Sequence, residues 1–89
     1  MRRAFEISKQ VRCMSDADGA VLLDLKGGKY FSLNPLGALV WQLLEQRADR
    51  KSIEQEIVDT FDVPAATAAQ DLDRFLGDLQ QKGLVRDQA

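Results

Sequence analysis

The chain has 89 residues, which is enough for one domain and not for two, so we expect a single domain spanning residues 1–89. An apolar fraction of 45% is ordinary for a globular protein, and no apolar run approaches the length of a membrane span. The formal net charge of -2 disfavours tight non-specific binding to nucleic acid, which usually requires a basic face.

The cysteine content and the N-terminus indicate the compartment. Cys13 is the only cysteine, so no disulfide can form within the chain. The start of the chain, Met1–Phe5, is basic but is not followed by the apolar stretch of a signal peptide. We therefore expect a cytoplasmic protein without a membrane partner.

The sequence lacks the residues that most catalytic mechanisms require. The sequence contains no histidine, and no cluster of Cys, His and carboxylates has metal-ligand spacing. Its one glycine pair, Gly27–Gly28, matches neither a Walker loop nor a dinucleotide-binding fingerprint. We expect no cofactor, no metal and no enzymatic activity, while a small enzyme subunit built on Asp, Glu, Lys and Ser stays as a minor alternative.

The first third of the chain reads as three strands. Short β-type stretches cover 11–14, 20–25 and 29–33, separated by the turn formers of Ser15–Gly19 and by Lys26–Gly28. A two-residue loop at Gly27–Gly28 places Leu22, Asp24, Phe31 and Leu33 on one face. A three-residue loop at Lys26–Gly28 instead gathers Val21, Leu23, Leu25, Phe31 and Leu33. We favour the three-residue loop because it gives the more apolar face and puts Gly28 in the left-handed position.

The remainder predicts three helices. Asn34 can cap a helix that begins at Pro35 and reaches about Gln46, and its Trp41 is expected in the core. Ser52, with Gln55 three residues later, can cap a second helix, and Pro64 can open a third that stops at Gly83. The order predicts an α+β fold of winged helix-turn-helix type, a three-stranded antiparallel sheet followed by three helices.

The segment from Val21 to Leu44 carries the main functional signal. From the residues alone it is a hairpin that leads into a capped core helix. It also resembles the PqqD-like family of recognition elements for ribosomally synthesised, modified peptides. The matching pieces are Leu23-Asp24, Gly27-Gly28, Tyr30-Phe31, Leu33-Asn34 and Val40-Trp41, followed later by Asp71-Leu72, Phe75-Leu76, Leu79 and Gly83-Leu84-Val85. The resemblance covers roughly Val11 to Val85.

The resemblance implies a mode of binding. In the family, the leader of a precursor peptide adds as a strand to the third strand and lies against the third helix. We therefore expect the outer edge of Lys29–Leu33 to be free for strand addition. The expected peptide-binding residues are Lys29, Tyr30, Phe31, Ser32, Leu33, Asp71, Leu72, Arg74, Phe75 and Asp78.

Most of these residues also have a purely structural interpretation. Phe31, Leu33, Leu72 and Phe75 fit plain core positions as well as a groove floor. The charged residues Asp71, Arg74 and Asp78 fit a solvated helix face as well as a groove rim that pairs with charged leader side chains.

The resemblance also implies partners. The segment from Lys29 to Pro35 resembles the stand-alone recognition proteins of lasso-peptide pathways more closely than it resembles PqqD itself. Those proteins hand the precursor to a leader peptidase and an ATP-dependent cyclase. A PqqD-type chaperone would instead serve a radical SAM enzyme. The rival function is a winged-helix DNA-binding regulator, which the sequence opposes because Gln70–Gln80 carries Asp71, Asp73 and Asp78 against Arg74 alone.

Overall fold

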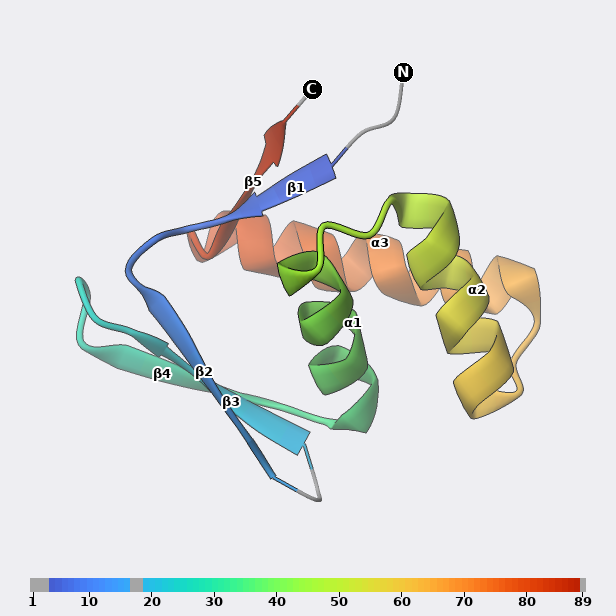
Figure 1. Cartoon of the computed structure of the whole chain (residues 1–89), viewed down its shortest axis with the longest axis horizontal. Coiled ribbons are helices and arrows are strands. Elements are labelled where there is room, and N and C mark those ends of the chain that lie inside the picture. Colours follow the sequence, from blue (N-terminus) through green and yellow to red (C-terminus); the bar gives the residue numbers. More distant parts are fainter. Residues whose placement is uncertain (1–3, 17–18, 89) are drawn as a thin grey trace.

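The computed structural model describes residues 4–16 and 19–88, and their arrangement is α+β (Figure 1). Three strands form an antiparallel sheet of order β2-β3-β4: β2 (Val11–Asp16), β3 (Gly19–Asp24) and β4 (Lys29–Leu33). Three helices follow: α1 (Pro35–Glu45), α2 (Arg50–Phe61) and α3 (Ala65–Gln81). The predicted three-stranded sheet followed by three helices is confirmed. In Figure 1, α1 lies between the sheet on one side and α2 on the other.

A second, two-stranded sheet was not predicted from the sequence. It pairs β1 (Ala4–Ile7) with β5 (Val85–Gln88) in antiparallel register, so the two ends of the chain lie side by side. Arg86 and Glu6 are 2.7 Å apart across this pair. A four-residue strand whose partner lies about eighty residues away leaves no local signal in the sequence.

The predicted register of the central hairpin was wrong. Leu22 pairs with Phe31, and the loop is Leu25–Gly28, one residue longer than the favoured three. Asp24 fixes this loop: its Oδ1 accepts from the N–H groups of Lys26 and Gly27. Its carbonyl oxygen accepts from the N–H of Gly28 at 2.8 Å. Leu22 is therefore fully buried and Leu25 is 54% exposed, which are the faces of the rejected two-residue alternative.

The helix ends follow the sequence signals with one exception. The Oδ1 of Asn34 accepts from the N–H of Gly37 at 2.8 Å, so the predicted cap of α1 is confirmed. The predicted Ser52 cap was wrong, because α2 begins earlier and the Oδ1 of Asp49 accepts from the N–H of Ser52. Gly83 has a φ of 73°, the left-handed stop expected after α3.

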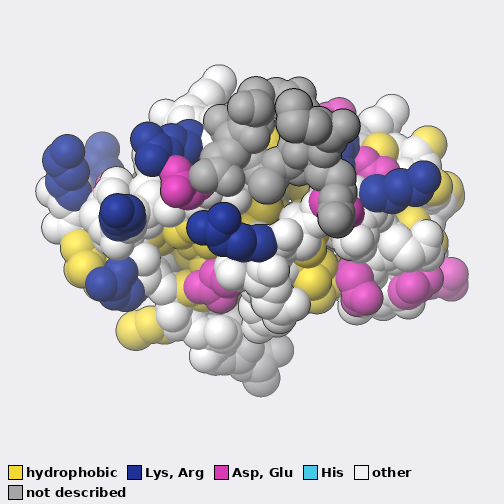
Figure 2. Space-filling model, turned by 45° about the horizontal axis from the view of Figure 1, so that its top comes forward, with side chains coloured by type: hydrophobic (Ala, Val, Ile, Leu, Met, Phe, Trp, Pro, Cys, Tyr) yellow, Lys and Arg dark blue, Asp and Glu magenta, His cyan; other side chains and the backbone are white. Residues whose placement is uncertain are grey.

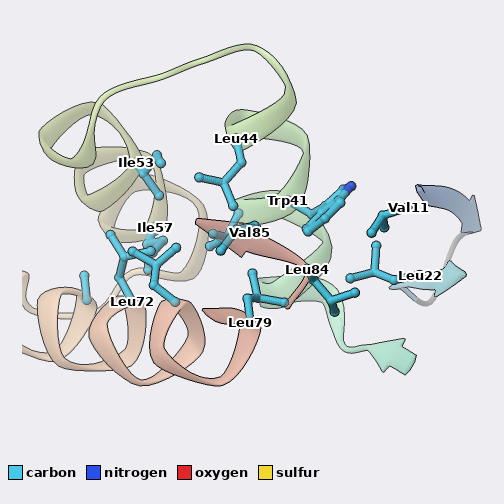
Figure 3. Packing of buried hydrophobic residues seen from close by; sticks show 13 residues of the cluster. Val11, Leu22, Trp41, Leu44, Ile53, Ile57, Leu72, Leu79, Leu84 and Val85 are labelled. Carbon is cyan, nitrogen blue, oxygen red and sulfur yellow. The ribbon is translucent and has the colours of Figure 1, made fainter. Parts of the chain in front are cut away.

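The core lies where α1 meets the sheet on one side and the α2–α3 pair on the other. Trp41 is 1% exposed, which confirms its predicted place, and Leu22 and Val11 reach it from the sheet (Figure 3). Ile53 and Ile57 of α2 face the fully buried Leu72 of α3. Cys13 is half-buried, and burial together with the charge of Glu45 raises the pKa of its thiol.

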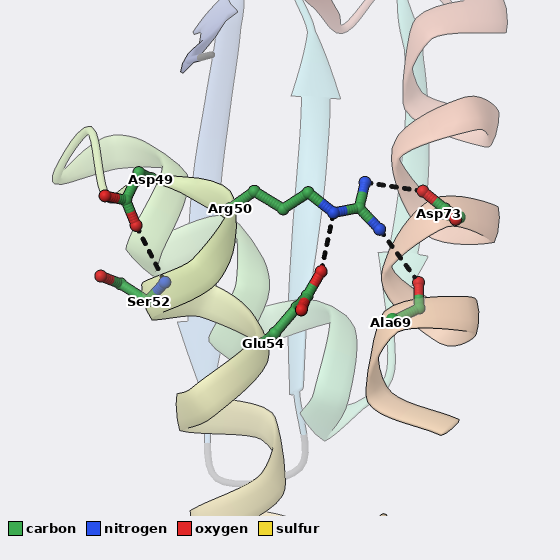
Figure 4. Close-up of polar contacts among 6 residues, drawn as sticks. All are labelled: Asp49, Arg50, Ser52, Glu54, Ala69 and Asp73. Atoms are coloured by element: carbon green, nitrogen blue, oxygen red, sulfur yellow. Dashed lines mark hydrogen bonds and ion pairs between the residues drawn. The ribbon is translucent and has the colours of Figure 1, made fainter. Parts of the chain in front are cut away.

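One arginine ties α2 to α3 (Figure 4). Arg50 lies 2.7 Å from Glu54 on its own helix and 2.6 Å from Asp73 on α3, and it donates to the carbonyl of Ala69. Burial opposes its charge, but these carboxylates raise the pKa of the guanidinium above its ordinary value. This side of α3 is thus closed by packing and by paired charges.

Candidate functional site

The outer edge of β4 has free backbone groups. β4 pairs only with β3, so its other edge has no strand beside it within the described residues. The carbonyl of Asp24 points toward β4, since it accepts from Gly28, whereas the N–H of Leu25 points the other way to Gln10. Backbone groups alternate between the two edges along a strand. It follows that Lys29, Phe31 and Leu33 bond to β3, and that the N–H and C=O groups of Tyr30 and Ser32 point outward.

A groove of about 470 Å³ runs along this edge, between β4 and α3. We call it the central groove. It is lined by Tyr30, Phe31, Ser32, Leu33, Asn34, Phe75, Asp78, Leu79, Lys82 and Leu84. The backbone edge of β4 therefore lies directly beside the central groove, whose other wall is formed by the partly apolar face of α3.

Two further hollows extend the central groove at its ends. One shares Asn34, Phe75 and Asp78 with it and adds Leu36, Asp71 and Arg74. We call this hollow the α1 end. The other shares Phe31 and Lys82 with it and adds Asp24, Gly27, Lys29 and Gln81. We call this one the hairpin end. The three hollows together follow the whole length of β4.

Aromatic side chains form the floor of the groove. Phe31 of β4 and Phe75 of α3 are half-buried and pack against the core. The ammonium of Lys82 lies 5.7 Å from the centre of the Phe31 ring, within the range of a cation–π contact. Gly37 allows the close approach of Phe75, because a Cβ at this position would lie 3.2 Å from the Phe75 ring.

The structure brings nine of the ten expected peptide-binding residues to these hollows and places the tenth elsewhere. The residues of β4 line the central groove, with Lys29 at the hairpin end. On α3, Phe75 and Asp78 line the central groove, and Asp71 and Arg74 line the α1 end. Leu72 is fully buried in the core and lines none of the three hollows.

Several lining residues were not expected from the sequence. Leu79 and Lys82 continue the helical row of Phe75 and Asp78 at intervals of three and four, so the periodicity of α3 carried the signal for both. Asn34 and Leu84 border the groove for a different reason. They lie just outside β4 and α3, where only the tertiary fold brings them to the groove.

Two other kinds of feature were sought in the described part of the chain, a membrane-spanning helix and a metal site. No helix within residues 4–16 and 19–88 is both long enough and apolar enough to cross a membrane. Over the same residues, no three His, Cys, Asp or Glu side chains gather as metal ligands would.

The fold and the open strand edge define a class of small α+β protein with a groove for an extended chain. The family model of coenzyme PQQ synthesis protein D (PqqD) matches residues 19–85, and the chain belongs to this family. No curated protein matches it significantly.

Two solved structures share the fold. One is TbiB1 in complex with the TbiA(beta) leader peptide, with 34% identity, a TM-score of 0.86, and coverage of 91% of this chain and 94% of that one. The other is a lasso peptide synthetase B1 complexed with the leader peptide, with 24% identity, a TM-score of 0.84, and coverage of 92% and 96%. At its lower identity, the second structure supports the shared fold alone.

Proposed function

We propose that this protein binds the leader of a ribosomally synthesised precursor peptide by strand addition to the outer edge of β4. The observation that carries this proposal is the free edge at Tyr30 and Ser32, which runs beside the central groove. An added strand would satisfy these backbone groups, each bond contributing about 0.5–1.5 kcal/mol net. Its side chains would alternate between the groove and solvent.

The leader-bound state of TbiB1 supports the choice of ligand, because that protein and this chain are 34% identical over almost their whole lengths. The expected peptide-binding residues are those named above for β4 and for the groove side of α3. Leu72 would act by supporting the groove from the core, since it is fully buried.

The protein would act as a carrier and not as an enzyme, in the cytoplasm, with no cofactor. It would present the bound precursor to the leader peptidase and the cyclase of a lasso-peptide pathway. We expect the purified protein alone to leave its precursor intact, as checked by mass spectrometry after long incubation. Cleavage by a preparation free of peptidase would overturn the carrier role.

A second candidate is a PqqD-type chaperone that delivers its peptide to a radical SAM enzyme. The PqqD family match favours it, whereas the resemblance of Lys29–Pro35 to the stand-alone recognition proteins of lasso-peptide pathways favours the lasso pathway. Co-purification with each class of enzyme in the presence of the precursor would decide between them.

The test of strand addition removes one outward backbone donor. Ser32 sits opposite Val21 in a pair that makes no ladder bond, and proline is tolerated on an edge strand when its nitrogen faces outward. Ser32→Pro should bind a synthetic leader about threefold to tenfold more weakly than Ser32→Ala, which keeps the N–H. The probe is the TbiA(beta) leader peptide, the ligand of TbiB1, and affinity is measured by fluorescence anisotropy.

Thermal melts of both variants show whether the fold is kept. If Ser32→Pro does not fold, the same question is put to the wild-type protein with leaders N-methylated at single positions. If the leader adds as a strand, leaders that are N-methylated at every second position along the strand should bind more weakly than the unmodified leader. Equal affinity for Ser32→Pro and Ser32→Ala, or N-methylation without effect at every position, would contradict strand addition on β4.

A further inference from the structure

The two ends of the groove carry opposite charge. The α1 end is lined by two acidic residues, Asp71 and Asp78, and by one basic residue, Arg74. None of the three makes an ion pair with another described residue. Asp73, the neighbour of Arg74 in the sequence, differs from these residues because it forms an ion pair with Arg50 on the α2 side of α3. The α1 end therefore holds two carboxylates and one guanidinium, and no ion pair within residues 4–16 and 19–88 engages them.

The hairpin end is basic. Lys29 and Lys82 line it, and neither pairs with a carboxylate among the described residues. The one acid there, Asp24, already accepts hydrogen bonds from the backbone of Lys26 and Gly27. Figure 2 shows the same trend on one face of the molecule, where most basic side chains lie toward the hairpin side and most acidic ones toward α2.

The separation of these charges fits an extended peptide. Asp71 and Lys82 are eleven residues apart on α3, which is about 16 Å along the helix axis. An extended strand covers that distance in about five residues. The carboxylates at one end and the ammonium groups at the other are thus spaced to contact two parts of one bound strand.

We propose that the groove selects a peptide whose charge runs from basic beside the α1 end to acidic beside the hairpin end, the two about five residues apart. This inference rests on the proposed function, since it assumes a strand on β4. In antiparallel pairing, the pattern of the rest of the sheet, the N-terminal part of the peptide lies beside Leu33 and Asn34. The basic residues then come first and the acidic residues follow.

The test selects binders from a random peptide library displayed on mRNA, with the full-length wild-type protein as bait. Enriched peptides should carry Lys or Arg about five residues before Asp or Glu. Lys82→Glu should turn the preference at the later position toward basic residues, and Asp71→Lys should turn the earlier position toward acidic ones. Each change should alter the affinity of a selected peptide about threefold to tenfold, and less in high salt.

The matched controls are Lys51→Glu and Glu56→Lys, which make the same charge changes at exposed positions of α2, away from the groove. They should leave the selected charge order unchanged. Binders that compete for β4 but show no charge order, or the reverse order, would overturn this inference and leave the proposed function standing. A selection without binders, or with binders indifferent to Ser32→Pro, would overturn both.

Discussion

Helix α3 presents two unlike flanks to the rest of the molecule. Toward α2 it is closed: Leu72 packs on Ile57, and Asp73 is paired with Arg50 at 2.6 Å. Toward β4 it is open: Phe75 is only half-buried, and Asp78 lies on the groove without an ion pair among the described residues. Both flanks belong to one helix, so the difference reflects what each flank contacts and not the stability of the helix itself.

The comparison separates folding from binding. The closed flank has its apolar surface covered and its charges matched, so changes there should act mainly on the free energy of unfolding. On the open flank, the edge of β4 has no neighbouring strand among the described residues, and aromatic and charged side chains line the groove. Changes there should therefore act mainly on affinity for a peptide. The substitutions of Leu72 and Arg50 below test this separation, and all predictions are ordered from the largest expected effect to the smallest.

Leu72→Ala should be the most damaging of these substitutions. Leu72 is fully buried in the closed flank, so its truncation should cost about 2–5 kcal/mol in the free energy of unfolding. Urea denaturation followed by circular dichroism measures the change. Leu25→Ala is the control, since Leu25 is 54% exposed, and it should change the stability little. Similar losses for the two variants would contradict the assignment of Leu72 to the core.

Gly19→Ala tests how β3 meets the end of β4. Gly19 has a φ of 150°, and a Cβ there would lie 2.1 Å from the carbonyl oxygen of Leu33. Backbone strain and this clash together should cost about 2–4 kcal/mol. The measurement is again urea denaturation, with Gly77→Ala as control, because a Cβ at Gly77 meets no atom within 4 Å. A Gly19→Ala protein as stable as Gly77→Ala would contradict the described approach of the two strands.

Arg50→Ala should weaken the closed flank moderately. Arg50 bridges Glu54, Asp73 and the carbonyl of Ala69, but it is partly exposed, so water and salt screen its ion pairs. We expect a loss of about 1 kcal/mol in stability that shrinks in high salt, with leader affinity unchanged. A large loss of affinity without a loss of stability would show that the two flanks are coupled.

Cys13 should react slowly in the folded protein. Burial and the charge of Glu45 raise the pKa of its thiol, so less thiolate is present near neutral pH than in the unfolded chain. Alkylation by iodoacetamide, followed by mass spectrometry, should be slower for folded protein than for protein in guanidinium chloride at the same pH. Equal rates in the two states would contradict this environment.

The order of elements was predictable because its signals are local. Asn34-Pro35 starts α1 as expected, and Gly83 stops α3. The register of the hairpin was not predictable from the alternation pattern, since Val21, Leu22 and Leu23 are all apolar and either face could be buried. The turn contacts of Asp24 and the packing of Leu22 decided it. Strand β1 was not predicted either, because its pairing also depends on a tertiary contact: its partner, β5, is at the other end of the chain.

The position of the candidate site was expected on β4 and α3, and its composition was only partly expected. Asp71, Arg74, Phe75 and Asp78 were expected at the site. The same helical periodicity extends to Leu79 and Lys82, which were not among the expected peptide-binding residues. The opposition of charge between the two ends did not follow from the sequence, because it depends on Lys29 of β4 lying near Lys82 of α3 at one end of the groove.

Amide hydrogen exchange of the protein with and without a synthetic leader shows directly whether the peptide binds at the outer edge of β4. In the free protein, the amides of Tyr30 and Ser32 should exchange quickly, because they point outward, whereas that of Phe31 is held by β3. Leader binding should slow exchange at Tyr30 and Ser32 and along Asp71–Lys82. Protection confined to β2 or to α2, with the edge of β4 unchanged, would place the peptide elsewhere and contradict strand addition on β4.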